Sequence, residues 1–168
     1  LVAGNTVLLK PSEVTVATGL MIEKLVKRVP ELAPYVRVLH GDGSVGEALV
    51  QCAPDFIFLT GSPRTGRLVA KAAAEFLIPM TFELGGKDPM IVLEDADLAS
   101  AARWGVWGAY YNAGQACMSV ERVYVVEQVY DEFLRLAIEE TGKLKLGYSP
   151  SKDGPLFVGP ISDPRQIK

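Results

Sequence analysis

Short apolar runs alternate with stretches of helical periodicity along the first half of the chain. The apolar runs predict four strands, at residues 7–9, 36–39, 56–59 and 80–84. Between them, apolar positions spaced three or four residues apart predict three helices, at residues 17–29, about 41–52 and about 61–76. The strands are apolar on both faces, which is typical of a parallel sheet covered by helices. We therefore predict an α/β fold.

The same alternation restarts after Gly85-Gly86. It predicts a strand at 90–93, a helix capped by Asp95-Ala96-Asp97 and running to about Ala113, a strand at 122–126 and a helix at 130–143. The glycine pair is therefore our predicted boundary between two α/β units.

Composition narrows the function classes. The 168 residues are 49% hydrophobic and 22% charged with a net charge of −3, so nothing indicates a basic surface for nucleic acid or a polybasic membrane patch. Apolar runs all fall well short of the roughly 20 residues that span a bilayer. Two widely spaced cysteines favour a reducing cytosol over a disulfide framework, and a single histidine argues against a zinc site. Because the chain begins without Met, we read it as an excerpt from a longer protein, truncated at both ends.

Cys117 and Glu83 are the candidate catalytic residues. Cys117 lies among small and amide-bearing residues, in Asn112-Ala113-Gly114-Gln115-Ala116-Cys117, where substrate could reach a thiol. Glu83 precedes the Gly85-Gly86 turn, where water could reach a carboxylate. The pair predicts a covalent thiol nucleophile with a separate carboxylate base. The other thiol, Cys52, is expected to be buried and inert against a sheet.

Three segments in the first half are candidates for holding a nucleotide. Residues 61–66 join a strand to a helix, and free N–H groups there could bind a phosphate, with help from the Ser62 hydroxyl. Residues 41–46 match G-x-G-x-x-G, but no acidic residue ends a strand about 20 residues later, so the match is weak. Lys10 and Glu13 follow a strand and could clasp a ribose. Without other evidence, Lys10 and Glu13 could equally be solvent-exposed residues at the start of a helix.

Four segments occur in an order that resembles the NAD(P)-dependent aldehyde dehydrogenase superfamily. They are residues 4–13, 60–67, Phe82-Glu83-Leu84-Gly85-Gly86-Lys87, and the cysteine segment 112–117. The resemblance covers essentially the whole chain. It implies that residues 1–85 are part of a Rossmann-like, parallel-sheet NAD-binding domain and that residues 86–168 begin an α/β catalytic domain. It also implies a parent enzyme that is a homodimer or homotetramer in the cytoplasm, acting on a small-molecule aldehyde.

The resemblance assigns roles residue by residue. Cys117 would be the nucleophile and Glu83 the general base. Gly43 would lie near the adenine. The implied cofactor-binding residues are Lys10, Ser12, Glu13, Gly43, Thr60, Gly61, Ser62, Thr65, Gly66, Leu84 and Gly85. No metal ligand is implied. The Glu13 carboxylate would repel a phosphate added to the ribose, which favours NAD over NADP.

The implied reaction oxidises an aldehyde to a carboxylic acid through a cysteine thiohemiacetal and a thioester, which water activated by Glu83 hydrolyses. Three alternatives stay open: a coenzyme A-acylating relative, a Glu83-Lys87-Cys117 carbon–nitrogen hydrolase, and a non-catalytic relative. The superfamily's oxyanion asparagine would lie upstream of Leu1 and its second ribose-binding glutamate downstream of Lys168. We therefore expect these 168 residues alone to be inactive.

Overall fold

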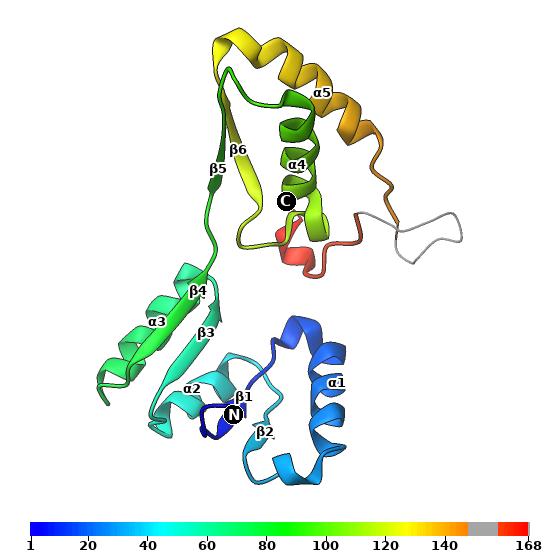
Figure 1. The fold of residues 1–168 in the computed structure, drawn as a ribbon. Helices are drawn as coiled ribbons and strands as arrows, with labels where there is room; N and C mark the ends of the chain where they lie inside the picture. The colour runs from blue at the N-terminus through cyan, green and yellow to red at the C-terminus, as the bar shows by residue number, and fades with distance from the viewer. Residues whose placement is uncertain (148–157, 168) are drawn as a thin grey trace. The chain divides into compact units, whose positions relative to one another are not determined.

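The computed structural model describes residues 1–147 and 158–167, in which helices and strands alternate along the chain (Figure 1). The chain divides into two compact units, Leu1–Glu83 and Leu84–Lys168. The predicted α/β fold is confirmed.

Unit 1 contains four strands and three helices. In chain order they are β1 (Val7–Leu9), α1 (Val16–Lys27), β2 (Val36–Val38), α2 (Gly43–Gln51), β3 (Ile57–Gly61), α3 (Pro63–Ala74) and β4 (Met80–Leu84), whose last residue begins unit 2. β1 pairs in parallel with β2, with Val7 opposite Val36, and β3 is hydrogen-bonded to β4. The described strands therefore form separate pairs instead of the single sheet that their apolar character suggested.

Unit 1 closes around a small apolar cluster formed by α2, α3 and the chain leading into β4. Val50, Ala73 and Ile78 are buried together, and Ile57 and Met80 pack against them. Because Ile57 lies on β3 and Met80 on β4, this cluster fixes the two strands whose carboxyl ends lead into α3 and to Glu83.

The described part of unit 2 repeats the pattern with two strands and two helices. They are β5 (Asp88–Val92), α4 (Leu98–Tyr110), β6 (Val120–Val125) and α5 (Tyr130–Gly142). β5 and β6 are parallel, and Val92, Ala102 and Phe133 form a core between the strand pair and the two helices. Five short 3₁₀ helices complete the described structure, at Glu13–Thr15, Pro30–Leu32, Tyr111–Gly114, Glu127–Val129 and Pro164–Gln166.

Polar caps start three of the helices where the sequence places them. The carboxylate of Asp42 accepts from the Ser44 N–H at 2.9 Å, the Ser62 hydroxyl from the Thr65 N–H at 3.2 Å, and the Asp97 carboxylate from the Ser100 N–H at 3.1 Å. Each satisfies one of the N–H groups that a helix start leaves without a partner.

Several boundaries differ from the prediction by one to three residues, and two of these differences have a clear cause in the backbone. α4 ends at Tyr110 instead of about Ala113, because Asn112 and Ala113 have positive φ angles that no right-handed helix contains. β5 starts at Asp88 instead of Met90, with a register irregularity between Asp88 and Pro89. That irregularity accommodates a proline, which has no N–H to give to a ladder.

Candidate active site

Cys117 lies on the loop between α4 and β6, at residues 111–119, which we call the thiol loop. Its thiol is exposed and free of any disulfide, as a nucleophile requires. Cys52 is also free, but it caps the end of α2 and is exposed. The expectation that Cys52 is buried is wrong, because α2 buries Val50 and Cys52 lies at the exposed end of the helix.

The thiol loop has an unusual backbone. Asn112 (φ 52°, ψ 36°), Ala113 (φ 59°, ψ 32°) and Gly114 (φ 73°) are three consecutive residues in the left-handed region. This conformation costs an L-residue roughly 1–2 kcal/mol, and it persists only where surrounding contacts impose it. Such backbone is common at functional sites, and here it directly precedes the segment that presents the thiol.

Glu83 is the last residue of unit 1 and lies near the end of β4. Side chains alternate along this strand, so that Thr81 and Glu83 are exposed while Phe82 and Leu84 are half-buried. The Glu83 carboxylate is therefore accessible to water. Gly85 and Gly86 follow, and a Cβ on Gly86 would lie 2.8 Å from Oδ2 of Asp88, so the turn into β5 passes close to that carboxylate.

Lys10 and Glu13 lie together where β1 ends. The Lys10 ammonium is 3.4 Å from the Glu13 carboxylate and donates to the carbonyl of Pro11 at 3.0 Å. Ser12 caps the short helix that follows, because its hydroxyl accepts from the N–H of Val14 at 3.2 Å. An ammonium donor beside a carboxylate acceptor matches the hydroxyl groups of a ribose, so these residues fit the predicted cofactor contact.

The loop that matches G-x-G-x-x-G forms the start of α2. Gly41 has φ 151°, and a Cβ there would lie 2.3 Å from Val45, so the tight turn requires glycine. A hydrogen bond from Ser44 holds the pKa of the Asp42 carboxyl below its usual value. Gly43 is exposed, and nothing lies within 4 Å of where its Cβ would be, which leaves room above this turn. The Lys10 side chain passes 3.8 Å from where a Cβ of Gly46 would be, so this loop and the end of β1 are neighbours.

The second glycine turn starts α3. Thr60 and Gly61 end β3, Ser62 caps the helix, and the Ser62 and Thr65 hydroxyls are 3.0 Å apart. Gly66 is buried in the first turns of the helix. Because the hydroxyls and open N–H groups of a 12-residue helix meet at this end, the residues fit a phosphate group by charge and hydrogen bonding.

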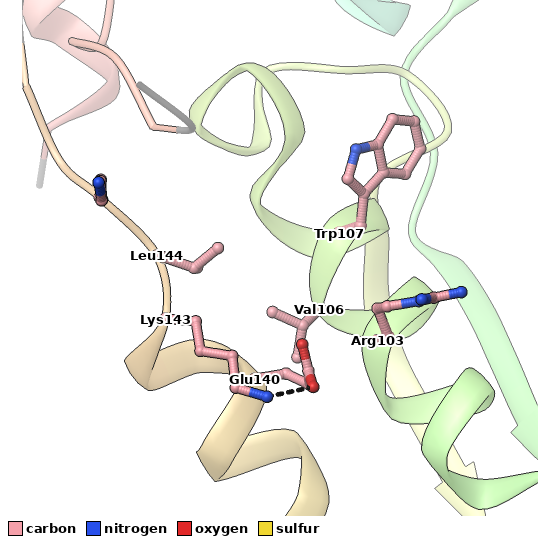
Figure 2. A pocket seen from close by; sticks show the side chains of 7 residues that line it. Arg103, Val106, Trp107, Glu140, Lys143 and Leu144 are labelled. Atoms are coloured by element: carbon pink, nitrogen blue, oxygen red, sulfur yellow. Dashed lines mark hydrogen bonds and ion pairs between the residues drawn. The ribbon is translucent and has the colours of Figure 1, made fainter. Parts of the chain in front are cut away.

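The structure also forms a pocket in unit 2 that the sequence did not indicate. It has a volume of about 340 Å³ and lies between the end of α5 and the middle of α4, lined by Arg103, Val106, Trp107, Glu140, Lys143, Leu144 and Lys145 (Figure 2). The Lys143 ammonium pairs with Glu140 at its edge, 2.7 Å away. Cys117 is not among its lining residues, so this pocket is distinct from the thiol loop.

The aromatic residues of α4 are more open than the sequence suggested. The helical spacing of Trp104, Trp107 and Tyr110 favours a place in the core or in a substrate-tunnel wall, yet all three are exposed in unit 2. Trp107 packs against Trp104 and Tyr111, with ring centroids 5.9 and 4.8 Å apart. The core expectation is wrong because α4 buries Ala102, Gly105 and Val106 instead.

Sequence reasoning missed three residues around the thiol loop. Ser119 is 3% exposed, and Gln115 contacts residues more than 40 positions away. Lys87, assigned from the sequence only to the alternative hydrolase triad, forms an ion pair with Glu121 across the start of the β5–β6 pair. A polar residue inside a glycine-rich segment gives no signal of a distant partner.

The model of the aldehyde dehydrogenase family matches residues 1–168. The chain belongs to the aldehyde dehydrogenase family.

Individual relatives agree. The 4,4'-diapolycopene aldehyde oxidase of Methylomonas sp is 43% identical over 167 residues, which are 99% of this chain and 31% of that protein. Lactaldehyde dehydrogenase from Escherichia coli shares 32% identity with a TM-score of 0.88, over 95% of this chain and 34% of that one. A variant of aldehyde dehydrogenase C from Pseudomonas syringae, solved with NAD⁺ and octanal, shares 35% identity with a TM-score of 0.86, over 96% and 33%. The chain thus spans about a third of the length of these relatives. Within residues 1–147 and 158–167, no helix is long and apolar enough to cross a membrane.

Proposed function

We propose that the protein oxidises an aldehyde to a carboxylic acid with NAD(P)⁺, with Cys117 as the nucleophile and Glu83 as the general base. The observation that carries the proposal is the free, exposed thiol of Cys117 on a loop with left-handed backbone. Family membership supplies the reaction class, and the exposed carboxylate of Glu83 supplies a base that water can reach.

The residues act in two stages. The Cys117 thiolate adds to the aldehyde carbon, forming a C–S bond while the carbonyl electron pair moves onto oxygen. When that electron pair re-forms the carbonyl, a hydride leaves the carbon and a thioester remains. NAD(P)⁺, when held by unit 1, would supply the acceptor for this hydride. Glu83 then takes a proton from water, the hydroxide adds to the thioester, and the C–S bond breaks to release the acid and the thiolate.

Unit 1 supplies the groups that would hold the cofactor. Lys10 and Glu13 suit a ribose, and the start of α3 with Ser62 and Thr65 suits the pyrophosphate. Gly43 leaves open space for the adenine at the start of α2. We propose NAD as the preferred cofactor, because the Glu13 carboxylate would repel a ribose phosphate. Similar structures include one solved with NAD⁺ and one of an NADP-dependent enzyme from E. coli, so the proposed preference rests on Glu13 alone.

We also propose a cellular compartment and an oligomeric state for the protein. Two free, exposed thiols suit a reducing compartment such as the cytosol. We propose that the complete enzyme acts on a small-molecule aldehyde and is a homodimer or homotetramer. Light scattering of the purified full-length protein would test the oligomeric state.

The decisive experiment is cofactor reduction by the full-length protein with a panel of aldehydes, with and without coenzyme A. Octanal is a suitable aliphatic member, since a similar structure was solved with it. Acid and NADH formed without coenzyme A are the expected result. Strict dependence on coenzyme A would move the protein to the acylating class, and no reduction with any aldehyde would refute the proposal.

The nucleophile is tested within the same assay. Cys117→Ser should lower turnover roughly 10³-fold or more, because a serine hydroxyl is far less ionised than a thiol. Cys52→Ser is the matched control, since Cys52 is also free and exposed, and it should retain wild-type turnover. Equal loss in both variants would contradict the assignment of Cys117.

A further inference from the structure

The side chain of Gln115 joins two parts of unit 2 that are far apart in the sequence. Its amide nitrogen donates to the carbonyl of Asn112 at 2.9 Å and to the carbonyl of Pro160 at 3.3 Å. Its amide oxygen accepts from the N–H of Ser162 at 2.9 Å. In Figure 1 the segment of residues 158–167, drawn in red, lies beside the loop that follows α4.

These partners define one orientation of the amide. Two of them are carbonyl oxygens, which only the NH₂ end can satisfy, and the third is an N–H, which only the oxygen can satisfy. Both amide protons and the oxygen are therefore used, and all three bonds go to backbone groups. Toward the 158–167 segment, the Gln115 amide provides one donor and one acceptor, as a backbone peptide group does between paired strands.

The bonds to Asn112 bear directly on the left-handed turn. The Asn112 carbonyl accepts from the Gln115 backbone N–H at 3.1 Å as well as from its side chain, and the Asn112 amide donates back to the Gln115 carbonyl at 3.1 Å. Ala113, which follows Asn112, has no polar side chain with which to offset its left-handed conformation. The turn is therefore held by Gln115 and Asn112 reaching across it.

The 158–167 segment has its own attachment to the body of unit 2. Leu146 and Val158 form a parallel bridge, with the Gly147 N–H donating to the Val158 carbonyl at 3.1 Å and the Val158 N–H to the Lys145 carbonyl at 3.2 Å. Asp163 caps the short helix at Pro164–Gln166 through the Arg165 N–H, 3.0 Å away. The segment is thus an anchored support for Gln115.

We propose that Gln115 is a positioning residue through which the 158–167 segment holds the thiol loop in its left-handed conformation and so places Cys117. Cys117 is two residues beyond Gln115, and Ser119 fastens the other side of the loop to α4. Cys117 therefore lies between two residues that hydrogen bonds hold in place, Gln115 and Ser119. The proposal rests on the proposed function of Cys117 as the nucleophile.

The test uses the full-length protein and compares Gln115→Glu with Gln128→Glu. A glutamate at position 115 has nearly the same shape, but it cannot donate to Asn112 or Pro160 and would place a charge against their carbonyls. Gln128 is exposed on the short helix at Glu127–Val129, so its variant carries the same charge change away from the loop. Gln115→Met, which keeps the volume without a charge, is a second variant in case Gln115→Glu fails to fold.

Hydrogen exchange and steady-state kinetics test the proposed role of Gln115. In Gln115→Glu, hydrogen exchange should accelerate roughly tenfold both in peptides covering 111–119 and in peptides covering 158–167, since each loses a partner. Turnover should fall about 10- to 100-fold while the KM for NAD⁺ stays within about twofold, because the thiol is displaced and the cofactor contacts are not. Gln128→Glu should leave all three quantities unchanged.

The inference can fail separately from the proposed function. Unchanged exchange in either segment, or turnover within about twofold of wild type, would overturn it. If the wild-type protein oxidises no aldehyde, the proposed function fails, and the alkylation rate of Cys117 by iodoacetamide takes the place of turnover. In that case a change of roughly threefold or more in Gln115→Glu but not in Gln128→Glu would support the inference, and equal rates would overturn it.

Discussion

The hydroxyl of Ser119 lies 3.2 Å from the carbonyl oxygen of Gly108, and it lies at the same distance from the carbonyl of Ala109. Both carbonyls belong to the last turn of α4, where the helix itself provides no N–H partner. Ser119 is buried, so its hydroxyl replaces water there and ties the start of β6 to the end of α4. The exposed Cys117 thus lies on a loop whose ends are closed by polar contacts.

Replacing Ser119 with alanine should therefore destabilise the protein. Ser119→Ala removes the single O–H donor that these two carbonyls share, and we expect a loss of about 1–2 kcal/mol in the free energy of unfolding. Urea denaturation of the full-length protein measures it. Ser162→Ala also removes a serine hydroxyl, but Ser162 is exposed and bonds to Gln115 through its backbone N–H, which the substitution keeps, so stability should change by less than about 0.5 kcal/mol. Equal effects of the two substitutions would contradict the structural role of Ser119.

Glu83→Gln should separate the two chemical stages. The amide cannot take a proton from water, so thioester hydrolysis should slow roughly 10²- to 10⁴-fold, while hydride transfer continues. Rapid-mixing kinetics should show a burst of about one NADH per active site followed by slow turnover. Glu75→Gln, at the end of α3 in the same unit, should behave as wild type. A wild-type steady-state rate in Glu83→Gln would remove Glu83 from the mechanism.

Local signals mark where three helices begin, and the prediction used the one at residues 95–97. Asp42, Ser62 and Asp97 are side chains that bond to nearby N–H groups, and α2, α3 and α4 start next to them. The end of α4 was predicted too late. Nothing in the identity of Ala113 signals a left-handed residue, because contacts from elsewhere impose that conformation.

The candidate site shows the same limit. The pairing of Lys10 with Glu13 and the cap by Ser62 act over three residues, and the sequence contains them as short motifs. The bonds from Gln115 to Pro160 and Ser162 span 45 and 47 residues. Only the folded chain brings those groups together, since no periodicity or spacing links a glutamine to a backbone carbonyl so far away.

A close contact beneath the Lys10 segment gives a third prediction. Gly19 is buried in α1, and a Cβ there would lie 2.8 Å from Cβ of Pro11. Gly19→Ala should therefore destabilise the protein by about 1–3 kcal/mol, despite the better helix propensity of alanine. Gly142→Ala, in the last turn of α5 with nothing within 4 Å, should be neutral or slightly stabilising. Thermal unfolding of both variants measures the difference, and a Gly19→Ala protein as stable as wild type would contradict the contact.

The last prediction concerns acid. The Glu23 carboxylate on α1 lies 2.6 Å from the Lys27 ammonium and 3.0 Å from the His40 ring, and these hydrogen bonds, that of Lys27 first, hold the pKa of Glu23 below its usual value of 4.5. A carboxyl whose pKa is lowered by folding adds stability that is complete above its unfolded pKa and disappears as the pH falls through its folded pKa. Wild type should therefore exceed Glu23→Gln in Tm above pH 4.5, and the gap should narrow below that pH. Glu31→Gln, an exposed glutamate on the short helix at Pro30–Leu32, serves as the control. A gap that stays constant from neutral pH to pH 3 would show that the charge of Glu23 does not stabilise the fold.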